Sequence, residues 1–198
     1  MAGRNRRHVQ PFPGAAAAQK EYCDFFQVPD ASPRRTTPGV YDCVTLGPVG
    51  KRVQLILLDT RMFRSPLKKD PANPKVTIPN TDPDATVLGE TQWAWFERRL
   101  REPAELRVVI SSIQLIANEH GSEKWDNFPK ERARFLELLR RTQAQGVVGC
   151  TSQSPCGSSR FGLSAWIRLH SSPGAWERTR GPRVMAAAPP GRRSRVAR

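Results

Sequence analysis

The chain has 198 residues, enough for one hydrophobic core of ordinary size, and a formal net charge of +14 at pH 7. The charge is concentrated at the ends, because residues 1–18 carry +3, residues 151–198 carry +8 and residues 19–150 carry only +3. This middle part is an ordinary mixed-charge surface, and the Arg-, Ala-, Gly-, Pro- and Ser-rich ends bury too little apolar area to fold, so we expect residues 1–18 and most of 151–198 to be poorly ordered.

The first predicted elements are two strands joined by a turn. Residues 40–46 and 52–58 have the composition of strands, and Gly47-Pro48-Val49-Gly50 between them favours a turn. We therefore predict a β-hairpin that enters a sheet. The second strand is almost wholly apolar, which is typical of a strand buried on both faces.

Charged and hydroxyl side chains follow this second strand directly. In open α/β sheets ligands bind beyond the carboxyl ends of the strands, and a guanidinium can hold a phosphate or carboxylate through two parallel hydrogen bonds. The candidate substrate-binding residues are therefore Asp59, Arg61 and Arg64. The alternative is structural, with Asp59 and Arg61 paired with each other or capping the local backbone, and the sequence leaves both interpretations open.

A proline-rich segment and a helix come next. Residues 66–87 contain five prolines, which forbid long regular structure and predict a surface loop. Glu90 then opens a helix in which Trp93, Phe96 and Leu100 recur at spacings of three and four. We interpret this stripe as core packing rather than as a platform for stacking nucleic-acid bases.

Strand and helix alternate in the rest of the middle part. Residues 106–113 form a second apolar strand, Pro129 begins another helix, and Val147 starts a third strand. The buried side of that helix is predicted to carry Phe135, Leu136 and Leu139. The order strand, helix, strand, helix, strand implies right-handed crossovers and a largely parallel sheet beside the hairpin, so the predicted fold class is α/β.

Cysteine and histidine spacing does not indicate a metal site. No cysteine pair has CxxC or zinc-finger spacing; the cysteines are Cys23, Cys43, Cys150 and Cys156. No histidine has a second histidine three or four residues away; the histidines are His8, His120 and His170. The cysteine usage favours reduced thiols in a reducing compartment. No stretch is long and apolar enough for a membrane span or a signal-peptide core, although the acid-free, Arg-containing start is similar to an organelle transit peptide, so the compartment stays unknown.

Collinear motifs resemble a known family. They are Phe25-Phe26, Ser32-Pro33-Arg34-Arg35, Pro38-Gly39-Val40-Tyr41, Leu58-Asp59-Thr60-Arg61, Phe63-Arg64, the run from Leu88 to Trp95, Ser111-Ser112-Ile113-Gln114, Glu123-Lys124-Trp125, Asn127-Phe128-Pro129 and Glu131-Arg132. Over about residues 19–148 the chain resembles the PhoD-like, or alkaline phosphatase D, branch of the calcineurin-like metallophosphatases. The expected domains are a disordered lead of residues 1–18, a partial PhoD-like domain of residues 19–150 and a low-complexity tail of residues 151–198.

The resemblance implies a fold, an activity and cofactors. The family has a layered α/β sandwich and hydrolyses phosphate mono- and diesters with two metal ions, such as Ca, Fe, Mn or Zn, held by Asp, Asn and His. It also implies a phosphate ester substrate, and that Asp59, Arg61 and Arg64 lie near the cleft. The motif Glu123-Lys124-Trp125 with Arg132 could line the same cleft, but an exposed ion pair and a buried Trp explain it equally well.

The ligand motifs of that family are not recognisable here. Its early motifs lie upstream of the segment that begins near Phe25, where this chain has only a short acid-poor lead, and its Gly-Asp-x-His motif is replaced by Gly149-Cys150-Thr151-Ser152. The abrupt change in composition after this point is typical of an altered reading frame, a spliced product or a mispredicted gene model. We therefore expect an incomplete copy that does not bind the metal ions and has no activity on its own.

Two other functions remain open. The Arg-rich ends could attract nucleic-acid backbones non-specifically, with an affinity that falls steeply with salt. Alternatively, a partial sheet with open edges could serve as a non-catalytic interaction protein.

Overall fold

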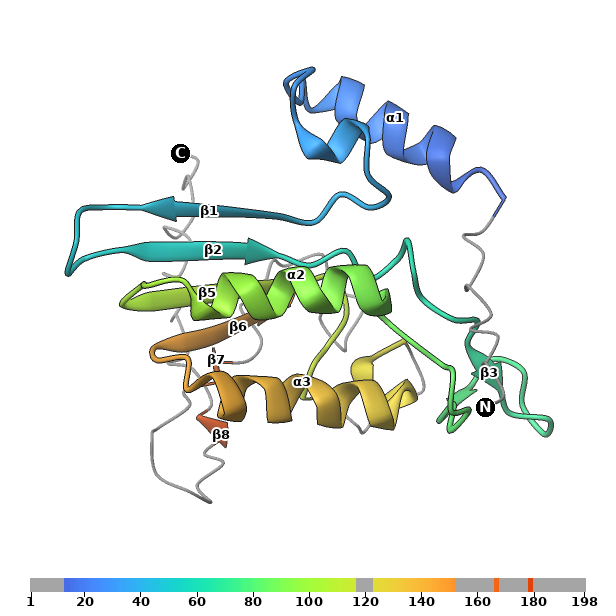
Figure 1. The fold of residues 1–198 in the computed structure, drawn as a ribbon. Helices are drawn as coiled ribbons and strands as arrows, with labels where there is room; N and C mark the ends of the chain where they lie inside the picture. Colours follow the sequence, from blue (N-terminus) through green and yellow to red (C-terminus); the bar gives the residue numbers. More distant parts are fainter. Residues whose placement is uncertain (1–12, 117–122, 152–165, 168–177, 180–198) are drawn as a thin grey trace, which may run out of the picture.

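A four-stranded mixed sheet is the centre of the computed structural model, which describes residues 13–116, 123–151, 166–167 and 178–179 (Figure 1). Strand β1 (Asp42–Leu46) pairs antiparallel with β2 (Val53–Leu57), and β2 pairs in parallel with β5 (Leu106–Ser111), which pairs in parallel with β6 (Val147–Thr151). The strand order is β1-β2-β5-β6. The predicted hairpin, the largely parallel sheet and the α/β fold class are confirmed.

The hairpin turn depends on one glycine. Gly47 has φ +91°, a conformation that L side chains rarely adopt, and a Cβ there would clash with the backbone oxygen of Lys51. The chain can therefore reverse between β1 and β2 only because this position has no side chain.

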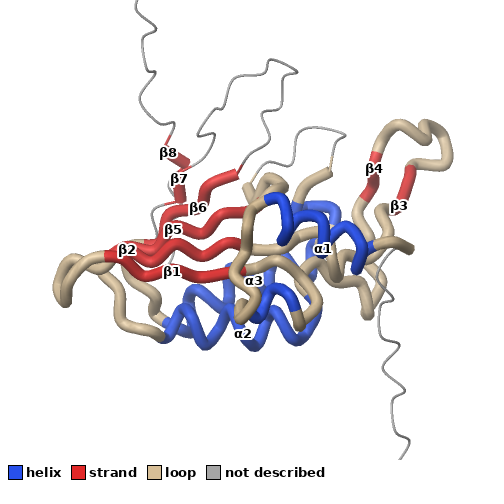
Figure 2. Tube along the Cα trace, turned by 90° about the horizontal axis from the view of Figure 1, so that it is seen from above, coloured by secondary structure: helices blue, strands red, loops and turns tan. Residues whose placement is uncertain are grey.

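Helices α2 (Gly89–Arg101) and α3 (Pro129–Thr142) cover one face of the sheet, as Figures 1 and 2 show from two directions. The predicted core stripe is confirmed, because Trp93, Phe96 and Leu100 are all buried. On α3, Phe135 and Leu139 are buried as predicted, whereas Leu138 is more deeply buried than the partly buried Leu136. Burial of each such large side chain contributes roughly 1.5–3 kcal/mol to the stability of the fold.

An N-terminal helix that the composition did not predict precedes the sheet. Helix α1 (Ala15–Phe25) packs against the 3-10 helix η1 (Pro33–Arg35), near the start of β1 (Figure 1). An ion pair joins the two helices: the Arg35 guanidinium of η1 lies 2.6 Å from the Asp24 carboxylate of α1. Residues 15–18 were expected to be poorly ordered, and this expectation is wrong: they form the first turn of α1, which packs against η1. Residues 1–12 lie outside the described residues.

The proline-rich segment contains a small hairpin. Strands β3 (Lys68–Lys69) and β4 (Thr77–Ile78) pair antiparallel and are two residues long, which agrees with the prediction that the prolines prevent long regular structure. The backbone N–H of Asn80 donates to the carbonyl of Asn127 at 2.7 Å, so the segment is attached to the 3-10 helix η2 (Trp125–Asn127).

Only short pieces of the C-terminal part are described. Strand β7 (Trp166–Ile167) pairs antiparallel with β8 (Arg178–Thr179). The remaining tail lies outside the described residues, and so do the charges of the Arg-rich ends other than that of Arg178. No helix in the described part of the chain is long and apolar enough to cross a membrane.

Candidate functional site

Three charged side chains meet beyond the carboxyl ends of β2 and β5. The Glu123 carboxylate lies 2.5 Å from Nη1 of Arg61 and 3.0 Å from Nε of Arg64. We call these three residues the arginine–glutamate cluster. The Arg61 side chain is 48% exposed, whereas those of Arg64 and Glu123 are 19% and 14% exposed. The cluster therefore carries a net charge of +1 with one guanidinium open to solvent.

The carboxylate of Asp59 binds backbone N–H groups and not the charged side chains of this cluster. It accepts hydrogen bonds from the backbone N–H groups of Val40, Arg61 and Met62, at 2.8–2.9 Å. Such bonds fix a loop that turns sharply after a strand. Arg61 does not pair with Asp59, as one interpretation of the sequence had it, but with a glutamate far away in the chain.

A buried glutamine extends the sheet by one residue at this position. The Asp59 N–H donates to Oε1 of Gln92 at 2.9 Å, and Nε2 of Gln92 donates to the Asp59 carbonyl at 2.8 Å. Gln92 is fully buried, so both backbone groups of Asp59 are satisfied by the side chain of α2. Nothing in the spacing of charged residues pointed to Gln92; the signal in the sequence was a polar residue between the core positions of an amphipathic helix.

Hydroxyl groups lie at the same edge of the sheet. Oγ1 of Thr60 and Oγ of Ser112 are 2.5 Å apart, joining the residues that follow β2 and β5. Beneath them, the indole nitrogen of Trp125 donates to Oγ of Ser111 at 3.0 Å. The edge thus presents small polar groups held by hydrogen bonds beside the arginine–glutamate cluster.

The segment that carries Glu123 is anchored by its aromatic neighbour. Trp125 is fully buried, 5.3 Å from Phe135 and 6.3 Å from Trp93 between ring centroids. Arg132, which shares the sequence motif, binds elsewhere: its Nε donates to the Leu115 carbonyl at 3.0 Å. The structure therefore brings Glu123 together with Arg61 and Arg64, and leaves Arg132 out of the cluster.

The described residues do not fit a metal site. Among them, no group of three or more His, Cys, Asp or Glu side chains could hold a metal ion. Burial raises the pKa of the Cys43 thiol to about 11 and also raises the pKa of Cys150, which disfavours the thiolate form that metals bind. His8, His120, His170 and Cys156 lie outside the described residues.

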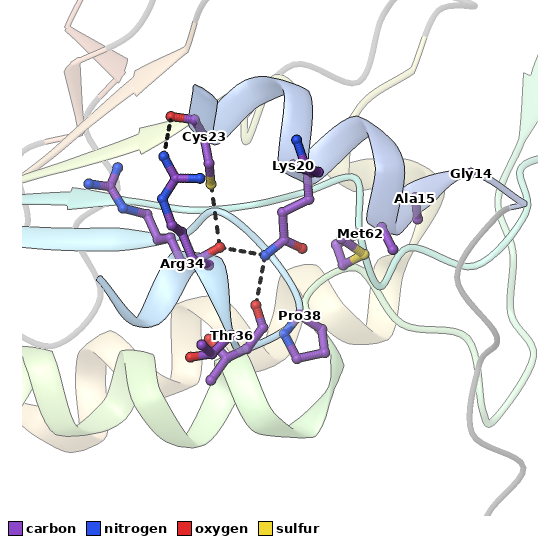
Figure 3. Close-up of a pocket in the computed structure, with 12 residues that line it drawn as sticks. Gly14, Ala15, Lys20, Cys23, Arg34, Thr36, Pro38 and Met62 are labelled. Atoms are coloured by element: carbon purple, nitrogen blue, oxygen red, sulfur yellow. Dashed lines mark hydrogen bonds between the residues drawn. The ribbon is translucent and has the colours of Figure 1, made fainter. Parts of the chain in front are cut away.

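A separate cavity of about 460 Å³ lies between α1 and residues 33–38 (Figure 3). The amide of Gln19 donates into its wall, to the carbonyls of Arg34 and Thr37, and the thiol of Cys23 donates to the Arg34 carbonyl. The cavity touches the loop after β2 only through Met62. It is therefore not part of the arginine–glutamate cluster.

Comparison with known proteins gives one family and one fold. The family model for PhoD-like phosphatases matches residues 12–154. A solved structure titled "Structure of PhoD" is similar with a TM-score of 0.55 and 24% sequence identity, covering 69% of this chain. The chain spans 28% of the length of that structure. No curated protein matches the chain.

Proposed function

Because the chain belongs to the PhoD-like phosphatase family, we propose that it binds phosphate esters at the arginine–glutamate cluster and does not hydrolyse them on its own. The observation that carries this proposal is the convergence of the Arg61 and Arg64 guanidinium groups beyond the carboxyl ends of two parallel strands. This is the region where open α/β sheets bind ligands.

A phosphoryl group would compete with Glu123 for the two arginines. The ion pair between Glu123 and the half-exposed Arg61 contributes only about 0.2–1 kcal/mol, so a phosphoryl group can replace the carboxylate at Arg61 at little cost. A phosphate monoester carries more negative charge than a carboxylate, and guanidinium groups bind it through paired hydrogen bonds. The half-exposed Arg61 gives the ligand access, and Arg64 provides the second, more buried contact.

Asp59 is proposed to position these groups rather than to bind the ester directly. Its carboxylate holds the N–H of Arg61 itself, at 2.8 Å, so the direction in which Arg61 leaves the strand depends on Asp59. The hydroxyls of Thr60 and Ser112 bond to each other at the same edge and hold the loop after β2 beside the end of β5.

Hydrolysis requires more than this cluster provides. The family uses metal ions that polarise the phosphoryl group and lower the pKa of a bound water. The described residues do not form such a ligand set. The proposed binding of phosphate therefore uses only the side chains of the cluster. We propose that this chain is an incomplete copy whose catalytic ligands are not among its described residues.

Two measurements on the purified full-length chain test the proposal. Calorimetry should detect phosphate binding that is lost in both Arg61→Gln and Arg64→Gln, and retained in Arg98→Gln, which removes an exposed arginine of α2. Hydrolysis of p-nitrophenyl phosphate and of its bis-ester should be negligible with Ca²⁺, Fe³⁺, Mn²⁺ or Zn²⁺. Absence of phosphate binding overturns the binding site, and robust metal-dependent turnover overturns the lack of activity.

A further inference from the structure

Among the described residues, strand β1 is the outermost strand of the sheet, and none of them pairs with its outer side. Within the described residues its only partner is β2, and Figure 1 shows α1 beyond the start of β1 rather than along its length. Val44 and Leu46 on this strand are 47% and 54% exposed. An apolar edge with unpaired backbone groups is a template for another strand.

The hydrogen bonds define which backbone groups face outward. The Cys43 N–H donates to the carboxylate of Asp42 at 2.8 Å, so it points away from β2. Because residues of an antiparallel pair alternate between inward and outward bonding, Thr45 also points its N–H and C=O to the open edge. Val44, between them, bonds toward β2.

We propose that β1 pairs antiparallel with β1 of a second copy of this chain, about a two-fold axis at Val44. In this register Cys43 of one copy lies opposite Thr45 of the other, and each exchanges its N–H and C=O bonds with the opposite residue. The two sheets become one sheet of twice as many strands. A two-fold interface of this kind uses the same surface on both copies.

The sequence of β1 is self-complementary in this register. Its one charged residue, Asp42, lies opposite the apolar Leu46 of the other copy, so no like charges meet. In the dimer the Cys43 N–H leaves the Asp42 carboxylate and donates to a backbone carbonyl of the other copy. Asp42 keeps its ion pair with Arg34, at 3.1 Å. The strand has no lysine, proline or bulge of the kind that blocks edge pairing in other sheets.

The two valines at the axis form the closest side-chain contact. Val44 faces Val44 of the other copy in a non-hydrogen-bonded pair, where the Cα atoms are about 4.5 Å apart. This distance lies within the range that a disulfide can bridge. Two cysteines at position 44 are therefore expected to form a disulfide between the copies in this register, which an interface elsewhere on the molecule would not allow.

Light scattering on the full-length chain tests the interface. The wild type should have twice the 22.2 kDa mass of one chain, and Val44→Lys should have the mass of one chain, because two lysines would meet at the axis. The matched control Val49→Lys, in the exposed turn, should remain a dimer. Thr45→Pro, which removes an outward N–H only, should also be monomeric, with folding of each variant checked by cooperative thermal unfolding. A wild-type monomer at the highest soluble concentration, or a folded Val44→Lys dimer, overturns the proposal.

Oxidative cross-linking tests the register independently. Val44→Cys should give a dimer linked by a reducible disulfide under mild oxidation, whereas the wild type and Val49→Cys should not. Absence of this cross-link in a dimeric Val44→Cys chain overturns the register about Val44.

Discussion

The indole nitrogen of Trp93 donates a hydrogen bond to the buried carboxylate of Glu131 at 2.9 Å, and this bond joins α2 to α3. The same carboxylate accepts from the backbone N–H of Val87 at 2.7 Å and from the hydroxyl of Thr86 at 2.8 Å. The N-cap residue of α2, Leu88, has no side-chain cap, and the Gly89 N–H donates to the Thr86 hydroxyl at 2.8 Å. Glu131, on α3, therefore accepts hydrogen bonds from donors that precede the first turn of α2.

We expect Glu131→Ala to lower the free energy of unfolding by about 2–4 kcal/mol, because it leaves the buried N–H groups of Trp93 and Val87 without an acceptor. The measurement is urea unfolding followed by tryptophan fluorescence. Glu137→Ala, on the exposed side of the same helix, should change stability by no more than about 0.5 kcal/mol. Equal effects of the two variants would show that the buried carboxylate has no special role.

Gln92→Leu should make hydrogen exchange faster in the segment after β2. The apolar side chain fills the same space, but it leaves both the N–H and the C=O of Asp59 buried without partners, at a cost of about 1–3 kcal/mol for each group. Hydrogen exchange of the Asp59 amide should become faster, and phosphate binding should weaken because the loop carrying Arg61 loosens. Thr91→Val, at the exposed neighbouring position, should leave both unchanged; unchanged protection of the Asp59 amide in Gln92→Leu would contradict the role of this pair.

Glu123→Gln should strengthen phosphate binding. The substitution keeps the size of the side chain and removes the anion that competes for Arg61 and Arg64, so calorimetry at low salt should give a lower Kd than for the wild type. The neighbouring Asp126→Asn removes an acid that pairs with Arg132 instead, at 3.3 Å, and should not change the Kd. Weaker binding in Glu123→Gln would mean that Glu123 orients the arginines and does not compete with the ligand.

Acid should weaken the contact between β2 and β5 at their amino ends. Hydrogen bonds from Arg52 lower the pKa of Glu105 from 4.5 to about 2. Since this pKa is lower in the folded chain than in the unfolded one, the stabilisation is present above pH 4.5 and is lost as the pH falls from 4.5 to about 2. Glu105→Gln should thus be less stable than the wild type at pH 7, and the difference should shrink across this interval.

Thermal unfolding at several pH values measures the contribution of Glu105. Asp84→Asn removes one exposed acid in the proline-rich segment and is the reference for a change in net charge alone. A difference between Glu105→Gln and the wild type that stays constant down to pH 2 would refute the linkage.

Periodicity and composition predicted most of the fold. The apolar runs that became β2, β5 and β6 and the stripe on α2 lie where they were expected, because burial in a sheet or on a helix imposes a regular spacing on the sequence. Helix α1 was missed, since four consecutive alanines carry no such spacing and their order comes from contacts with residues near Arg35. The short strands β3 and β4 likewise depend on tertiary contacts rather than on a pattern.

The sequence by itself determined which residue types follow the buried strand, and it therefore singled out Asp59, Arg61 and Arg64. Only the tertiary structure decided their partners: Asp59 turned to the backbone, and both arginines turned to Glu123, which lies 62 residues beyond Arg61. The physical reason is that local spacing reports which side of an element is buried, whereas a charged side chain pairs with whatever opposite charge the folded chain brings within a few ångströms.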